Sequence, residues 1–99
     1  MRQAGRSAVA QLLPLLKDRD DQVRLEVVKL LGALRAPETA AEVGHLLSDA
    51  SQEVRSHAAF ALAAIGDSSQ VGSLRAALVK EGFEEVRQDM ENAIRRLEK

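Results

Sequence analysis

Apolar residues recur along this chain at the spacing of one helical face, and the same set occurs three times. Within each set the members follow one another at offsets of 0, 4, 8 and 11 residues. The three sets are Val23, Val27, Leu31 and Leu34; Val54, Ala58, Leu62 and Ile65; and Val86, Met90, Ile94 and Leu97. At about 100° per residue these offsets share one face of an α-helix. The pattern predicts three amphipathic helices, which we call B helices, over residues 21–35, 52–65 and 84–98.

A shorter apolar pattern precedes each B helix and predicts a partner helix, which we call an A helix. The three A helices are expected near residues 8–17, 38–48 and 69–80. The valines that open the B helices are spaced at 54 − 23 = 31 and 86 − 54 = 32 residues. A period of this size with two helices is typical of stacked helical repeats. We therefore expect a single domain over residues 1–99, with repeats at about 5–35, 36–66 and 67–99.

Residues that stop or start helices stand between these segments. Asp20 and Ser51 each lie three residues before a valine, where a side-chain oxygen can cap the first turn of a B helix. Pro37 suits the first turn of the second A helix, and Gly66 suits the end of a B helix. Pro14 lies inside the first A helix and is expected to bend or loosen it. In the third repeat we expect Gly82 to stand in a turn that is one residue longer.

The most complete repeat resembles a known family. Residues 46–67 combine Leu46-Leu47-Ser48-Asp49 with Val54-Arg55, then Ala58, Ala61-Leu62 and Gly66-Asp67. This series resembles the short HEAT repeats, of the kind found in phycobilin lyase subunits. The resemblance implies an all-α fold, an α-solenoid of three stacked helix–turn–helix units with six helices. It implies little about function, because such repeats serve unrelated roles.

The resemblance also implies a ladder of hydrogen bonds between neighbouring repeats. By position, the acceptors would be Asp18 and Asp49, and the donors would be Arg24, Arg55 and Arg87. The third acidic position is occupied by Lys80-Glu81, so the third acceptor is expected to be missing. Each arginine lies about 100° from the inward valine, on the flank that faces a neighbouring repeat. The competing hypothesis is that the aligned arginines bind an anion, and we favour the structural role.

The two ends of the stack differ in sequence. The position of Val28 and Ala59, which should face the following repeat, is Glu91 in the third repeat. This charge is typical of a terminal repeat. At the other end nothing obvious covers Leu15, so we expect either an earlier repeat or self-association at this end.

Composition removes several classes of function. The net charge is −1, there is no Cys, and Phe60 and Phe83 are the only aromatic residues besides two histidines. Disulfides and thiolate metal sites are therefore excluded. No continuous basic stripe or stacking aromatic series favours nucleic acid. No apolar run suits a signal peptide or a membrane span, so we expect a soluble, cytoplasmic protein with no membrane partner.

No catalytic motif stands out. His45 and His57 are expected on different helices, without the His-Glu pairs of metal-dependent HEAT enzymes, so surface positions are favoured over metal ligation. No nucleophile or phosphate-loop signature occurs. We expect no cofactor and no metal, and a non-catalytic scaffold that binds another protein. The alternative is a subunit or fragment of a tetrapyrrole (phycobilin) lyase-like enzyme.

The remaining surface is the outward side of the B helices, which is concave in such stacks. The expected partner-binding residues are Leu25, Lys29, Ser56, Phe60, Gln88 and Asn92. Leu25 and Phe60 are the notable members because large apolar side chains on an outward face can mark a contact site. The alternative is that single exposed apolar residues carry no meaning.

Overall fold

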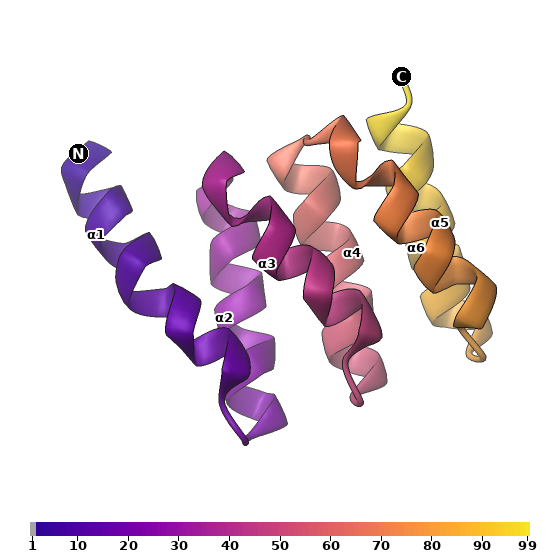
Figure 1. Cartoon of the computed structure of the whole chain (residues 1–99), viewed down its shortest axis with the longest axis horizontal. Helices are drawn as coiled ribbons and strands as arrows, with labels where there is room; N and C mark the ends of the chain where they lie inside the picture. Colours follow the sequence, from indigo (N-terminus) through magenta and orange to yellow (C-terminus); the bar gives the residue numbers. More distant parts are fainter. Residues whose placement is uncertain (1) are drawn as a thin grey trace.

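Helices and turns make up the whole of the chain that is described by the computed structural model, which covers the backbone of residues 2–99 and the side chains of residues 7–99 (Figure 1). The α-helices are α1 (Arg2–Leu12), α2 (Asp21–Leu34), α3 (Ala40–His45), α4 (Gln52–Ile65), α5 (Val71–Lys80) and α6 (Glu84–Leu97). Short 3-10 turns extend some of them: η1 (Leu13–Lys17), η2 (Pro37–Thr39), η3 (Leu46–Ser48) and η4 (Ser68–Gln70). The expected all-α fold of six helices is confirmed.

The helices form two layers of three. The B helices α2, α4 and α6 lie side by side, and the A helices α1, α3 and α5 cover them from the near side in Figure 1. The shortest dimension of the molecule is 16 Å, against 37 and 33 Å for the others. Among the B helices, α2 packs against α4 and α4 packs against α6, so each repeat contacts the next one, which is the geometry of a solenoid.

The helix boundaries follow the capping residues. The Asp20 carboxylate accepts from the Gln22 N–H at 2.9 Å, and the Ser51 hydroxyl accepts from the Val54 N–H at 3.4 Å. Gly66 ends α4 in the left-handed conformation with φ 81°. Pro14 lies in η1, just after α1 has ended, so the expected loosening of the first A helix is confirmed. These boundaries could be predicted because each depends on one local side chain.

The expected longer turn in the third repeat is wrong. Three residues link each A helix to its B helix, at 18–20, 49–51 and 81–83. The extra residue lies instead in α5, which stays α-helical to its end, whereas the first two A helices finish in η1 and η3. Four α-helical residues rise about 6 Å, as do three residues of 3-10 helix. The extra residue therefore leaves the turn in the same place.

The core lies between the two layers, with α4 at its centre. Leu31, Leu62 and Met90, one from each B helix, are fully buried. The B helices approach closely because small residues lie between them: a Cβ added at Gly32 would be 3.1 Å from the Ala61 Cα. One position departs from the expected core face, since Leu34 is 43% exposed.

The first prediction concerns the centre of this core. Leu62→Ala should lower the free energy of unfolding by about 2–5 kcal/mol, because a cavity would remain between α4 and both of its neighbours. Val79, which is 84% exposed on α5, provides the control: Val79→Ala should change stability by less than about 0.5 kcal/mol. Urea titration measures both, and equal effects of the two substitutions would contradict the assignment of the core.

The second prediction concerns the end of α2. Arg35 ends the helix with φ 51°, a left-handed conformation in which the aligned residue of the second repeat is Gly66. Arg35→Gly should raise the free energy of unfolding by about 0.5–1 kcal/mol, because glycine adopts this conformation without steric cost. Gly66→Ala should have the opposite sign. Thermal melts of the pair test the idea, which fails if both shift in the same direction.

Candidate functional site

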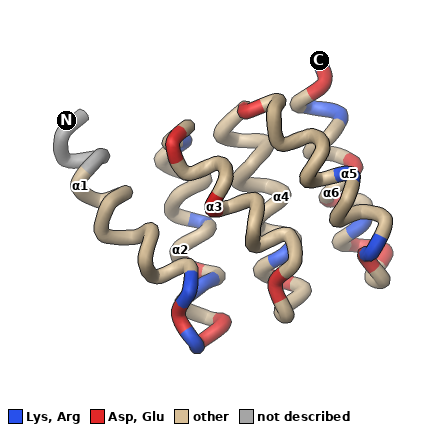
Figure 2. The backbone as a smooth tube through the Cα atoms, in the orientation of Figure 1, with Lys and Arg blue, Asp and Glu red and all other residues tan. Residues whose placement is uncertain are grey.

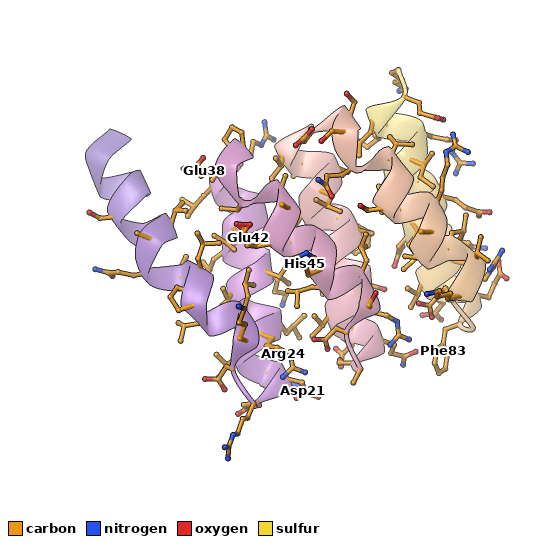
Figure 3. All side chains as sticks on the ribbon, viewed as in Figure 1. Asp21, Arg24, Glu38, Glu42, His45 and Phe83 are labelled. Carbon is orange, nitrogen blue, oxygen red and sulfur yellow. The ribbon has the colours of Figure 1, made fainter. Side chains whose placement is uncertain are left out.

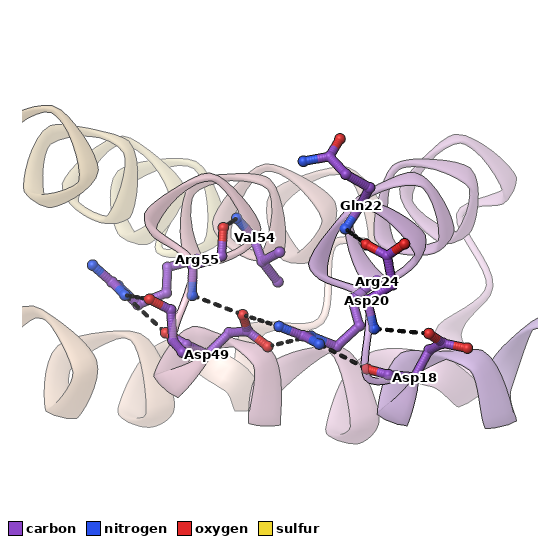
Figure 4. Close-up of polar contacts among 9 residues, drawn as sticks. Asp18, Asp20, Gln22, Arg24, Asp49, Val54 and Arg55 are labelled. Atoms are coloured by element: carbon purple, nitrogen blue, oxygen red, sulfur yellow. Dashed lines mark hydrogen bonds and ion pairs between the residues drawn. The ribbon is translucent and has the colours of Figure 1, made fainter.

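An arginine on each of the first two B helices joins two successive turns of the stack. Arg24 donates from Nε and Nη2 to the two carboxylate oxygens of Asp49, at 2.8 and 3.1 Å. Its Nη1 donates to the backbone carbonyl of Asp18 at 2.7 Å (Figure 4). One side chain thus holds the turn of its own repeat and the acid of the next. The expected ladder is confirmed at this interface.

The second interface repeats the first with an acceptor that the sequence analysis missed. Arg55 donates to the two carboxylate oxygens of Glu81 at 2.7 and 3.1 Å, and to the Asp49 carbonyl at 2.8 Å. The signal was available, because Glu81 lies six residues before Arg87, just as Asp49 lies six residues before Arg55. An alignment based on the arginines places Glu81 at the position of Asp49. An alignment based on the preceding A helices places Lys80 at that position instead.

Each end of the ladder is only half complete within the described residues. Arg87 donates to the carbonyls of Leu78 and Glu81 at 2.7 and 3.2 Å, and no described carboxylate pairs with it. Asp18 accepts from the Asp20 N–H at 2.8 Å, and no described arginine pairs with its carboxylate. At the two internal positions, Asp49 and Glu81 would have to be displaced before an anion could bind, so the structural role is favoured.

The two acids that accept from the ladder arginines have buried side chains. The Glu81 side chain is only 2% exposed, and the Asp49 side chain 8%. The hydrogen bond from Arg55 lowers the pKa of Glu81, outweighing the opposite effect of burial, and the Phe83 N–H adds to the lowering. The hydrogen bond to Asp49 raises the pKa of Arg24. Removing one partner would leave a buried charge unpaired, which is costly.

The second candidate site is the exposed side of the B helices, which we call the B face. It is formed by Gln22, Glu26, Lys29, Glu53, Ser56, His57, Phe60, Glu85, Gln88, Asp89 and Asn92. Four of the expected partner-binding residues are exposed here: Lys29, Phe60, Gln88 and Asn92. Ser56 is half-buried. The expected exposure of Leu25 is wrong, because this side chain is 5% exposed and belongs to the core.

The position of Leu25 on its helix explains the error. Leu25 lies two residues after Val23, at about 200° around the helix from that valine. The residues of α2 that are exposed on the B face, such as Glu26 and Lys29, lie at about 240–300° around the helix from Val23. The sector near 200° is covered by the following B helix. Only in α6, which no described helix follows, is the aligned residue, Gln88, exposed.

Two hollows on the B face meet at Phe60, which is 47% exposed. The first has a volume of about 200 Å³ and is mainly apolar; it is lined by Val28, Lys29, Gly32, His57, Phe60, Ala61 and Ala64. The His57 and Phe60 rings meet edge to face, with centroids 5.4 Å apart. Burial, and then the charge of Lys29, lower the pKa of His57. The imidazole is therefore neutral at neutral pH and adds no positive charge to this hollow.

The second hollow, of about 240 Å³, is acidic. Its lining residues are Gln52, Glu53, Ser56, His57, Phe60, Glu85, Val86 and Asp89, from α4 and α6. Phe60 and Ser56 were expected at this site from the sequence, but the acids beside them were not. These acids could have been predicted from the alignment of the repeats. Glu53 and Glu85 are aligned in successive repeats, so they lie at the same level on adjacent helices. Together the hollows place an apolar patch beside a negatively charged one.

The remaining candidate residues, Phe83 and the two histidines, form no further site among the described residues. Phe83, 54% exposed, lies at the turn between α5 and α6, with its ring centroid 6.0 Å from the Arg55 guanidinium carbon (Figure 3). Among the described residues, no group of three or more acids and histidines is placed to hold a metal ion. His45 lies on α3 and His57 on α4. None of the described helices combines the length and apolar character that crossing a bilayer requires.

Comparison with known proteins bears on the fold. A family model described as HEAT repeats matches residues 9–95. Among curated proteins, none matches the sequence. One similar solved structure is that of epoxyqueuosine reductase with a tRNA-Tyr epoxyqueuosine-modified stem loop. It has a TM-score of 0.79 and 24% sequence identity, and the match covers 89% of this chain but 28% of the reductase. At this identity the likeness shows the fold alone.

The third prediction concerns the buried acid of the ladder. Glu81→Gln should destabilise the protein at pH 7 by about 1–3 kcal/mol, because Arg55 loses its charged acceptor. Since folding lowers the pKa of Glu81 below its ordinary value of 4.5, the stabilisation is present above pH 4.5. It is lost as the pH falls through the pKa of the folded state.

Unfolding measured from pH 7 down to pH 2 tests this sign. The wild type should lose its advantage over Glu81→Gln at acid pH, so that the two stability curves converge. Glu38→Gln, an exposed substitution, is the control and should run parallel to the wild type. Parallel curves for Glu81→Gln as well would contradict the role of the charge.

Proposed function

The chain belongs to the HEAT-repeat family, and from this premise we propose that it is a non-catalytic scaffold that binds a segment of another protein on its B face. The observation that carries the proposal is the exposure of Phe60 between two hollows of opposite character. We propose that this binding takes place in the cytoplasm. The ladder and the core supply the fold, and the B face supplies the contact.

Phe60 is not required by the repeat. The aligned residues on α2 and α6 are Lys29 and Asn92, both polar, and both leave the packing of their helices unchanged. An exposed aromatic ring loses contact with water when a partner covers it, and aromatic anchors often dominate contact energies. Beside the ring, the apolar hollow is walled by Ala61, Ala64 and the Gly32 backbone, which leaves room for one side chain of the partner.

The charges around Phe60 define the chemistry of the partner. Glu53, Glu85 and Asp89 line the hollow on one side, and Glu26 and Lys29 lie on the other. The side facing α6 is therefore negative at neutral pH. A segment that fits both hollows carries an apolar side chain next to lysine or arginine. The same negative charge disfavours a nucleic acid backbone on this face.

The fourth prediction uses synthetic peptides as probes. Peptides with a central Leu or Phe flanked on one side by two Lys or Arg residues should bind the full chain, and matched peptides with Glu at the flanking positions should not. Phe60→Ser should weaken binding about tenfold or more, because it removes the apolar contact. Val79→Ser, on the exposed side of α5, is the control and should leave binding unchanged. Fluorescence polarisation in low and high salt measures all of these.

Two results would contradict this function. Equal binding of basic and acidic peptides would remove the electrostatic argument, and unchanged binding by Phe60→Ser would place the contact elsewhere. Thermal melts should show that Phe60→Ser folds as the wild type does, since the ring is half exposed. The sequence-based alternative, a tetrapyrrole lyase subunit, stays a prediction; a shift in the absorbance of a bilin on incubation with the chain would support it.

A further inference from the structure

Two side chains, His57 and Phe60, line both hollows of the B face. His57 lies three residues before Phe60 on α4, and the two rings meet edge to face with their centroids 5.4 Å apart. The imidazole is half-buried, so it forms part of the wall that the two hollows share. Of the two rings, only the imidazole gains or loses a proton near neutral pH. The charge of this wall therefore depends on the pH of the solution.

Charged residues lie along all three B helices, and several of them surround His57 (Figure 2). Those that face it are Glu26 and Lys29 of α2, Glu53 of α4, and Glu85 and Asp89 of α6. Burial lowers the pKa of His57 most, and the charge of Lys29 lowers it further, against the opposing effect of the acids. The imidazole therefore takes up its proton at a lower pH than an exposed histidine does.

The neutral imidazole leaves each hollow with its own character. The hollow between α2 and α4 is mainly apolar, and a neutral ring adds no charge to its wall. The hollow between α4 and α6 is lined by Glu53, Glu85 and Asp89, and no described lysine or arginine forms an ion pair with these acids. Their negative charge is therefore available to a cation of the partner.

The protonated imidazole changes both hollows in the same direction. A charge on the wall of the apolar hollow loses its water when an apolar side chain covers it, which is unfavourable. The same charge offsets one of the negative charges of the acidic hollow and repels an incoming lysine or arginine. Both effects act against a segment that carries an apolar side chain next to a basic one.

We propose that His57 determines the specificity of the B face: the neutral imidazole admits such a segment, and the imidazolium excludes it. The face therefore binds its partner at neutral pH and releases it in mildly acidic solution. This inference rests on the proposed function, because it concerns the same face and the same class of segment. The coupling is reciprocal, so a bound segment also disfavours the imidazolium and lowers the pKa of His57 further.

The test follows the binding of the basic peptides to the full chain as the pH is lowered. The peptides keep their charge, because lysine and arginine stay protonated throughout the range. Between about pH 7.5 and about pH 5 the affinity of the wild type should fall about threefold or more, because protonation of His57 competes with the peptide. His57→Gln should lose much less affinity, since glutamine gains no proton. His45→Gln on α3, in the other layer, is the matched control and should follow the wild type.

A change at Lys29 should move the pH at which binding is lost. The charge of Lys29 lowers the pKa of His57, and its ammonium group lies 3.6 Å from the Glu26 carboxylate. Lys29→Gln removes the repulsion and leaves Glu26 free to stabilise the imidazolium. Both changes raise the pKa of His57, so the loss of binding should begin at a higher pH than in the wild type.

NMR of the wild type measures the same coupling without any substitution in the B face. The imidazole resonances of His57 and His45 are titrated with and without saturating basic peptide, and His45→Gln assigns them. The pKa of His57 should fall when the peptide binds, and the titration of His45 should stay the same. This measurement holds even if His57→Gln fails to fold, which circular dichroism melts would show.

The outcomes separate this inference from the proposed function. Basic peptides that fail to bind at pH 7.5 would contradict the proposed function and this inference with it. Binding that is present at pH 7.5 but falls equally in the wild type and His57→Gln would leave the proposed function standing and overturn the role of His57. A pKa of His57 that stays the same on saturation with peptide would overturn it as well.

Discussion

The arginine that bridges two turns sets the geometry of the stack. Arg24 reaches the carbonyl of its own turn and the acid of the next, so its fixed fork defines how far apart two repeats can lie. Because the same reach recurs at Arg55, the three turns must present their acids at equal spacing. The extra residue of the third repeat is therefore absorbed inside α5, where a change from 3-10 to α-helical geometry leaves the turn unmoved. The close contact of Gly32 with Ala61 follows from this register.

Aligned residues have different surroundings in the first, middle and last repeats of the stack. Leu25, Ser56 and Gln88 hold the same place on their helices, yet they are buried, half-buried and exposed in turn. A B helix follows α2 and α4, which carry Leu25 and Ser56, but within the described residues none follows α6, which carries Gln88. On the side of each B helix that faces the preceding repeat, it is the first repeat that is exposed: Leu30 is exposed, whereas the aligned Ala61 and Ala93 are buried. Exposure in such a fold reports position in the stack as much as side-chain chemistry.

This distinction explains what the sequence could predict. The helices and their caps at Asp20 and Ser51 depend on spacing within one repeat, and spacing is visible in the chain. The ladder that joins Arg24 to Asp49 was implied by the resemblance to HEAT repeats. The burial of Leu25 depends on which side the next helix covers, and helical periodicity gives an angle without saying where the neighbour lies. Glu81 was missed for another reason. Glu81 aligns with Asp49 when the repeats are aligned on Arg87 and Arg55. The extra residue in α5 shifts the residues before Glu81 by one position, which hides this match.

Function is therefore best sought at positions that neither the ladder nor the core restricts. Phe60 holds such a position, because lysine and asparagine take its place in the other repeats without changing the fold. Its ring between an apolar and an acidic hollow is a property of this chain, whereas the arginines of the ladder are a property of the stack. Asp18 is the intermediate case: its carboxylate belongs to the ladder by position, yet within the described residues its arginine is absent. The filled places at Arg24 and Arg55 serve the stack itself, so the contact surface that distinguishes this chain is better sought at Phe60.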